Sequence, residues 1–127
     1  MRLLQNIFSS IFTLWVMIVF IGFMLLFLPL IIIPLLAGRK FSFIGYGTLY
    51  VWAWIFSFFT RIRYELIGRD KIKRNYSYIF TCNHTSFLDA PGVRLMIPGE
   101  FRPMAKKELT RIPIFGWIVS SACIIVD

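Results

Sequence analysis

The residues best suited to chemistry lie in one short run, Asn83-His84-Thr85-Ser86-Phe87-Leu88-Asp89, which contains the only histidine of the chain. If His84 lies on a loop and Asp89 in the first turn of a following helix, the carboxylate accepts a hydrogen bond from imidazole Nδ1 and leaves Nε2 as a base. A base held in this way takes the proton of an attacking hydroxyl. The spacing therefore favours general-base catalysis in which a substrate alcohol is the nucleophile.

The same run also has a structural interpretation. Ser86-x-x-Asp89 fits a capping box, and Asp89 with Pro91 shortly after it fits the start of a helix. Cys82 would share a strand face with His84, but no further ligand supports a cysteine nucleophile or a metal site. Spacing alone leaves catalysis and helix capping open.

The elements that must position this run follow from the pattern of the chain after residue 60. Ile62, Tyr64 and Leu66 alternate with outward-facing residues as in a half-buried strand, and strand-like and helix-like runs come after them. Strands alternating with helices predict an α/β layer structure. The expected strands are 62–67, 76–82, 101–105 and 124–126, and the expected helical runs are 90–97, 107–110 and 114–122.

The first 60 residues have the composition of a membrane segment. The chain has 127 residues, of which 58% are hydrophobic and 16% charged, and no charge lies between Arg2 and Arg39 or between Lys40 and Arg61. A soluble globular protein and a disordered one are both excluded. Residues 3–38 as one helix would reach about 54 Å, against about 30 Å for a bilayer core. Pro29 and Pro34 therefore predict a bent first helix.

The second apolar segment, residues 41–60, is rich in aromatic side chains that favour a membrane–water interface. Two arrangements stay open: a hairpin that spans the bilayer, or two helices that lie in one leaflet with both ends on the same side. Basic residues between 61 and 74 outnumber Arg39 and Lys40, which places the C-terminal half in the cytosol in either case. We expect a membrane anchor at 1–60 and a water-facing unit at 61–127.

The net charge of +8 indicates what kind of negatively charged partner the chain binds. Most aromatic residues lie in the apolar half rather than beside the basic residues, so nucleic acid is not expected and anionic membrane lipid is. Cys82 and Cys123 have no zinc or redox spacing, and we expect reduced, buried thiols. No metal and no bound cofactor are predicted.

The run from Asn83 to Asp89 resembles the N-H-x-S-x-x-D block of the glycerolipid acyltransferases, the 1-acyl-sn-glycerol-3-phosphate acyltransferase family. Met104-Ala105-Lys106-Lys107-Glu108-Leu109, followed by Ile112-Pro113-Ile114-Phe115-Gly116-Trp117, resembles the next segment of the same family. The two blocks, in this order and behind an apolar helical pair, make the resemblance specific and extend it over the whole chain.

The resemblance implies acyl transfer from acyl-CoA or acyl carrier protein to the free hydroxyl of lysophosphatidate, which gives phosphatidate. It assigns His84 as the base, Asp89 as the group that orients it, and Lys106 as a ligand of the substrate phosphate. The alternative for Lys106 is a solvated lysine in a Lys-Lys pair that binds no substrate. The implied fold is the N-terminal part of a mixed α/β acyltransferase domain behind its membrane anchor.

The resemblance also predicts that the domain is truncated. The last residues fit the start of a G-x-x-F-I-D-R-type run, with Asp127 at the position of its Asp, and the later Glu-Gly-Thr-Arg block does not occur. We therefore expect no turnover by these 127 residues alone. A non-catalytic membrane module of the same family, and a basic membrane-surface protein with a structural His84, are the alternatives.

Overall fold

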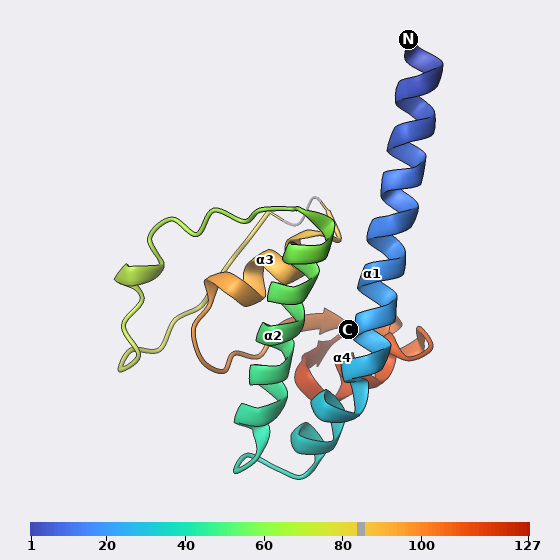
Figure 1. Cartoon of the computed structure of the whole chain (residues 1–127). Helices are drawn as coiled ribbons and strands as arrows, with labels where there is room; N and C mark the ends of the chain where they lie inside the picture. Colours follow the sequence, from blue (N-terminus) through green and yellow to red (C-terminus); the bar gives the residue numbers. More distant parts are fainter. Residues whose placement is uncertain (84–85) are drawn as a thin grey trace.

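The computed structural model describes residues 1–83 and 86–127, and its centre is an N-terminal helical hairpin (Figure 1). Helix α1 (Arg2–Leu36) and helix α2 (Ser42–Thr60) run antiparallel and are joined by a short turn. Gly38 takes a φ of 111° in this turn, a conformation that glycine adopts without strain. The predicted pair of apolar helices is confirmed.

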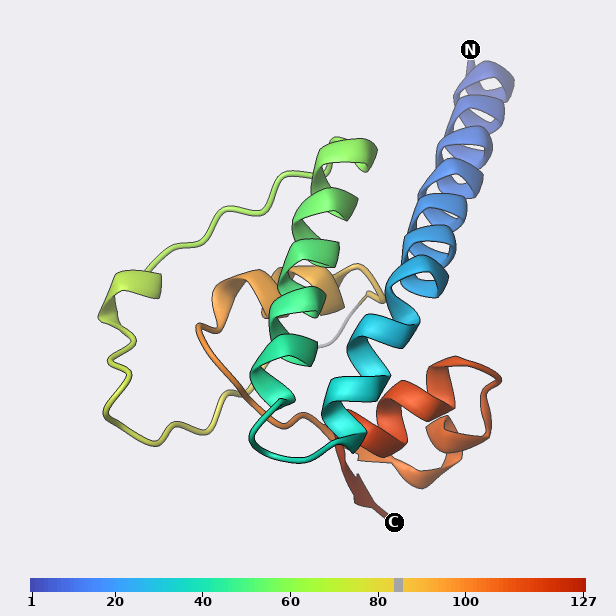
Figure 2. The ribbon, with the colours of Figure 1, turned by 60° about the horizontal axis from the view of Figure 1, so that its bottom comes forward.

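Helix α1 continues through both of its prolines. It is one α-helix over its whole length, with Pro29 and Pro34 inside it. Its cyan end departs from the axis of the blue part in both views (Figures 1 and 2), as expected where a proline removes a backbone donor. The prolines therefore redirect the helix without ending it.

Aromatic packing joins the two helices. The ring of Phe20 meets Trp52 edge to face, with centroids 4.9 Å apart, and meets Phe56 in the same way at 5.7 Å. Such edge-to-face pairs are favourable beyond the apolar area that they bury. On α1 and α2 the buried members of this core are Val16, Val19, Phe20, Met24, Ile31, Trp52, Ala53 and Phe56.

The N-terminal part of α1 lies outside this core. Every residue from 1 to 15 is exposed, and the blue end of the helix projects away from the other elements (Figure 1). The indole of Trp15 donates to the carbonyl oxygen of Phe59 at 3.2 Å, close to where α2 ends. Both helices are long and apolar enough to cross a membrane.

The C-terminal half contributes short elements. Helix α3 (Asp89–Met96) is followed by strand β1 (Met104–Lys106), a 3-10 turn at Lys107–Arg111, helix α4 (Phe115–Ala122) and strand β2 (Ile124–Val126). The two strands are parallel, with Ala105 opposite Ile125. The strand–helix–strand part of the α/β prediction is confirmed for β1, α4 and β2, although the described residues are mostly helical.

Two expected strands are wrong. Residues 62–67 and 76–82 form no strand, and the sheet of the described chain consists of β1 and β2. Ile62, Tyr64 and Leu66 still turn inward and pack on the hairpin core, while the residues between them are exposed. The alternation therefore predicted the buried side correctly. A strand also needs a neighbouring strand as a hydrogen-bonding partner, and alternation does not specify one.

Helix α3 packs against α2 through a buried charged residue. Arg94 is 7% exposed, and its guanidinium donates to the carbonyl oxygen of Tyr46 from Nε at 3.1 Å and from Nη2 at 2.7 Å. Nη1 donates to the carbonyl oxygen of Ile97 at 2.9 Å. Burial lowers the pKa of Arg94 from its ordinary value. The three hydrogen bonds offset the desolvation of the charge and fix α3 along α2.

Gly45 provides a direct test of the hairpin. A Cβ at this position would lie 2.8 Å from the carbonyl oxygen of Ile31 and 2.8 Å from Leu35 Cγ. Gly45→Ala is therefore expected to push α1 and α2 apart and to lower the free energy of unfolding by about 1–3 kcal/mol. Thermal unfolding in detergent micelles, followed by circular dichroism, measures the loss.

Gly47 is the matched control, because it lies in the same helix and a Cβ there meets no atom within 4 Å. Gly47→Ala is expected to raise stability by about 0.5–1 kcal/mol, since alanine is the better helix former. Equal stability of the two variants would contradict the close approach at Gly45.

Candidate active site

Ser86 and Asp89 close the turn that leads into α3. The backbone N–H of Ser86 donates to Asp89 Oδ2 at 3.0 Å, and the N–H of Leu88 donates to Ser86 Oγ at 3.2 Å. The N–H of Asp89 also donates to the carbonyl oxygen of Ser86 at 3.1 Å. The bond from the N–H of Ser86 to the Asp89 carboxylate is one half of a capping box, but it closes the turn before α3, whose N-cap is Leu88. It also holds the Asp89 carboxylate in one orientation.

Tyr64 braces the same turn from the segment after α2. Its hydroxyl donates to the carbonyl oxygen of Leu88 at 2.8 Å. Its ring lies against the backbone of α3, where a Cβ at Gly92 would come within 2.8 Å of Tyr64 Cδ1. Because Gly92 has no side chain, the Tyr64 ring can pack against the backbone at this position. The ring in turn fixes the first turn of α3 against the chain that follows α2.

An open cleft of about 300 Å³ lies in front of this turn. Its walls come from the Tyr64 segment, from the residues that precede position 84, and from one face of α3. Residues that line it include Tyr64, Leu66, Cys82, Asn83, Asp89 and Gly92. The cleft thus brings together the carboxylates of Glu65 and Asp89, an amide side chain and a thiol.

His84, the predicted base, lies outside the described residues, as does Thr85. The predicted hydrogen bond between His84 and Asp89 therefore stays a prediction. Asn83 and Asp89, which flank the predicted base in the sequence, both line the cleft.

Lys106, the predicted phosphate ligand, ends strand β1 opposite Val126 and is exposed. It is not among the described residues that line the Asp89 cleft. Its neighbour Lys107 forms an exposed ion pair with Asp127 at 3.5 Å. The assignment of Lys106 to the substrate phosphate stays a prediction.

The cysteines differ from expectation in their burial. Cys82 is exposed and lines the cleft, so the prediction of a buried thiol is wrong for this residue. The chain before it forms no helix or strand and leaves it uncovered. Cys123 is half-buried, and burial raises the pKa of its thiol. Both are free thiols.

Tyr64 is the site residue that sequence reasoning missed. Alternation placed it on the inner side of its segment, but its hydrogen bond joins residues 24 positions apart. No local pattern connects Tyr64 to Leu88 or to Gly92. The one signal available in the sequence was that a tyrosine predicted to turn inward needs a hydrogen-bond acceptor for its hydroxyl group.

The comparison with family models decides the family. The model described as Acyltransferase matches residues 63–127, which include the braced turn, the cleft and strand β1. The chain belongs to the acyltransferase family. Its reaction class is therefore acyl transfer, as the resemblance of its two sequence blocks implied. No curated protein and no solved structure matches the chain.

Tyr64 predicts a pH dependence of stability. Burial, and after it the Asp89 carboxylate, raises the pKa of Tyr64 to about 12 from 10.0. Unfolded tyrosine ionises near pH 10, so this stabilisation is complete below about pH 10 and is lost as the pH rises towards about 12. Tyr64→Phe should destabilise the chain by about 1 kcal/mol at neutral pH, and the difference should shrink at alkaline pH. Chemical unfolding at both pH values measures it.

Tyr76→Phe is the control, because Tyr76 is 64% exposed. This variant should follow the unsubstituted protein at every pH. The same alkaline loss of stability in the Tyr64→Phe variant and in the unsubstituted protein would contradict the role of Tyr64.

Proposed function

We propose that this acyltransferase moves an acyl group from acyl-CoA or acyl carrier protein to the free hydroxyl of lysophosphatidate, and so makes phosphatidate for phospholipid synthesis. The observation that carries the proposal is the fixed carboxylate of Asp89 at the edge of a cleft within the matched acyltransferase region. The lipid acceptor is supported by the hairpin, whose apolar helices hold the same cleft at the end of α2.

In the proposed reaction His84 acts as the base and Asp89 as its positioning residue. The imidazole takes the proton of the acceptor hydroxyl while the hydroxyl oxygen attacks the thioester carbon. The C–S bond then breaks, and the leaving thiolate takes the proton back from the imidazolium. Asp89 needs a fixed orientation for this role, and its bond from the N–H of Ser86 supplies one. The acyl group ends as an ester of the acceptor, and no redox change occurs.

The membrane arrangement that we propose is insertion into one leaflet. The ring of Tyr50, in the middle of α2, has the Arg69 guanidinium 5.6 Å away and the Arg94 guanidinium 5.5 Å away. Charged groups at the middle of a spanning helix are costly in hydrocarbon. A hairpin that lies along one interface keeps both groups near water and places Arg2 and Arg39, at the two ends of α1, among headgroups.

Single-cysteine labelling tests this arrangement. Lys40→Cys at the hairpin turn and Asp70→Cys, both exposed, are made in a chain that lacks Cys82 and Cys123. A membrane-impermeant maleimide added to sealed vesicles should label both positions from the same face. Labelling of the two positions from opposite faces would show that the hairpin spans and would refute the proposal.

Acyl transfer is tested with acyl-CoA and lysophosphatidate in membranes that contain a full-length version of the domain, one that also carries the later blocks of the family. His84→Ala should abolish phosphatidate formation by removing the base, a loss of about 10²–10⁴ in rate. Asp89→Asn should lose most of the activity, because the tautomer of His84 is no longer enforced. Both proteins should remain in the membrane fraction, since neither change touches the hairpin core. Thin-layer separation of the labelled product measures the rate.

Asp70→Asn and Lys107→Gln serve as matched controls in this assay. Asp70→Asn removes an exposed carboxylate away from the cleft and should leave the rate unchanged. Lys106→Gln should raise KM for lysophosphatidate several-fold more than Lys107→Gln does, because only Lys106 is assigned to the phosphate. Normal turnover by the His84→Ala protein would refute the catalytic assignment of His84. Absence of turnover in the unsubstituted full-length protein would favour the non-catalytic membrane module.

A further inference from the structure

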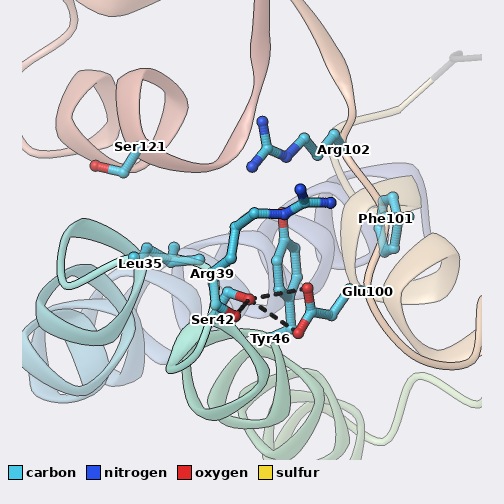
Figure 3. A pocket seen from close by; sticks show the side chains of 9 residues that line it. Leu35, Arg39, Ser42, Tyr46, Glu100, Phe101, Arg102 and Ser121 are labelled. Carbon is cyan, nitrogen blue, oxygen red and sulfur yellow. Dashed lines mark hydrogen bonds between the residues drawn. The ribbon is translucent and has the colours of Figure 1, made fainter.

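A second hollow lies at the opposite end of α2, beside the hairpin turn (Figure 3). Its volume is about 370 Å³. Arg39 comes from the turn and Ser42 begins α2, while Glu100 and Arg102 come from the chain before β1 and Ser121 from α4. Three parts of the chain, distant in sequence, therefore meet at this hollow.

Two guanidinium groups dominate the hollow. The side chains of Arg39 and Arg102 both extend into the space between the hairpin turn and α4 (Figure 3). Neither forms an ion pair with a carboxylate in the described part of the chain. Two like charges that share one hollow repel each other, and an anion placed between them would remove that repulsion.

The acid of the hollow is held to one side. Both carboxylate oxygens of Glu100 lie 2.9 Å from Ser42 Oγ, which is also 2.9 Å from the carbonyl oxygen of Arg39. The hydroxyl has one proton, so these three oxygens are alternative acceptors. Glu100 offsets one of the two arginine charges, and the hollow keeps an excess of positive charge.

We propose that this hollow is a binding site for a phosphate ester, separate from the Asp89 cleft. Guanidinium groups bind phosphate oxygens in pairs of parallel hydrogen bonds, and the N-terminus of α2 adds its positive dipole end. The volume holds a phosphate group with part of its alcohol. The phosphate belongs either to the headgroup of an anionic lipid or to a soluble phosphate. Affinity should be modest and salt-sensitive, because both arginines are exposed.

Binding of two probes tests the site, with the whole chain in detergent micelles or added to vesicles. The probes are inorganic phosphate and phosphatidylcholine vesicles with or without phosphatidate. Arg39→Gln and Arg102→Gln should each weaken binding about three- to tenfold, the loss of one exposed charged contact. Glu100→Gln should strengthen it, because the variant keeps a hydrogen-bonding partner for Ser42 and removes the repelling charge.

Lys40→Gln is the matched control, since Lys40 carries the same charge next to Arg39 but does not line the hollow. It should change binding less than twofold, a margin well below one charged contact. His84→Ala should also bind normally, so failure of the catalytic proposal leaves this one intact. Circular dichroism of each variant checks that the helices are kept.

The outcomes separate the two sources of phosphate. Arginine-dependent binding of both probes identifies phosphate itself as the ligand, and arginine-dependent binding of phosphatidate vesicles alone identifies a lipid headgroup. Equal losses in the Lys40→Gln and Arg39→Gln proteins would show unspecific attraction to basic residues. That result, or unchanged binding in the Glu100→Gln protein, would overturn the site.

Discussion

The packing of α1 against α2 is the interaction on which every other element depends. Apart from Leu95 of α3 and Ile118 of α4, the buried members of the main apolar cluster belong to these two helices. The described part of the C-terminal half therefore joins the hairpin core through Leu95 and Ile118. Close approach of the helices at Gly45 and the edge-to-face contacts of Phe20 set the geometry of that surface. The two apolar helices thus supply most of the buried apolar cluster of the described chain.

Two contacts then fix α3 along α2 and position the turn that contains Asp89. Arg94 binds the backbone of Tyr46 near the start of α2, and Tyr64 binds the backbone of Leu88 just beyond the end of α2. Because α3 is held at both ends, the Asp89 turn has a fixed place beside the chain that leaves the hairpin. The cleft beside Asp89 and the hollow lined by Arg39 and Arg102 consequently lie at opposite ends of α2.

In the arrangement that we propose, α2 connects the lipid surface with the cleft beside Asp89. The proposed lipid acceptor has an apolar tail and a polar head, which suits positions where an apolar helix ends and a polar loop begins. Both the cleft and the hollow lie at such ends of α2. Arginine rather than lysine is the suitable residue for the buried position at 94, because its planar fork reaches two backbone carbonyls at once.

The sequence by itself determined the two apolar helices, the helix at α3, the crossover from β1 through α4 to β2, and the resemblance to the acyltransferases that the family model confirms. These features depend on local composition, periodicity and spacing, which a linear pattern records. The alternation of apolar residues after α2 also predicted that Tyr64 turns inward. Only the tertiary structure decided that residues 62–67 and 76–82 form no strand and that Cys82 is exposed. It also decided that Arg39 and Arg102 line the same hollow. Each of these depends on a partner distant in the chain, and neither periodicity nor residue type specifies which distant segment will supply it.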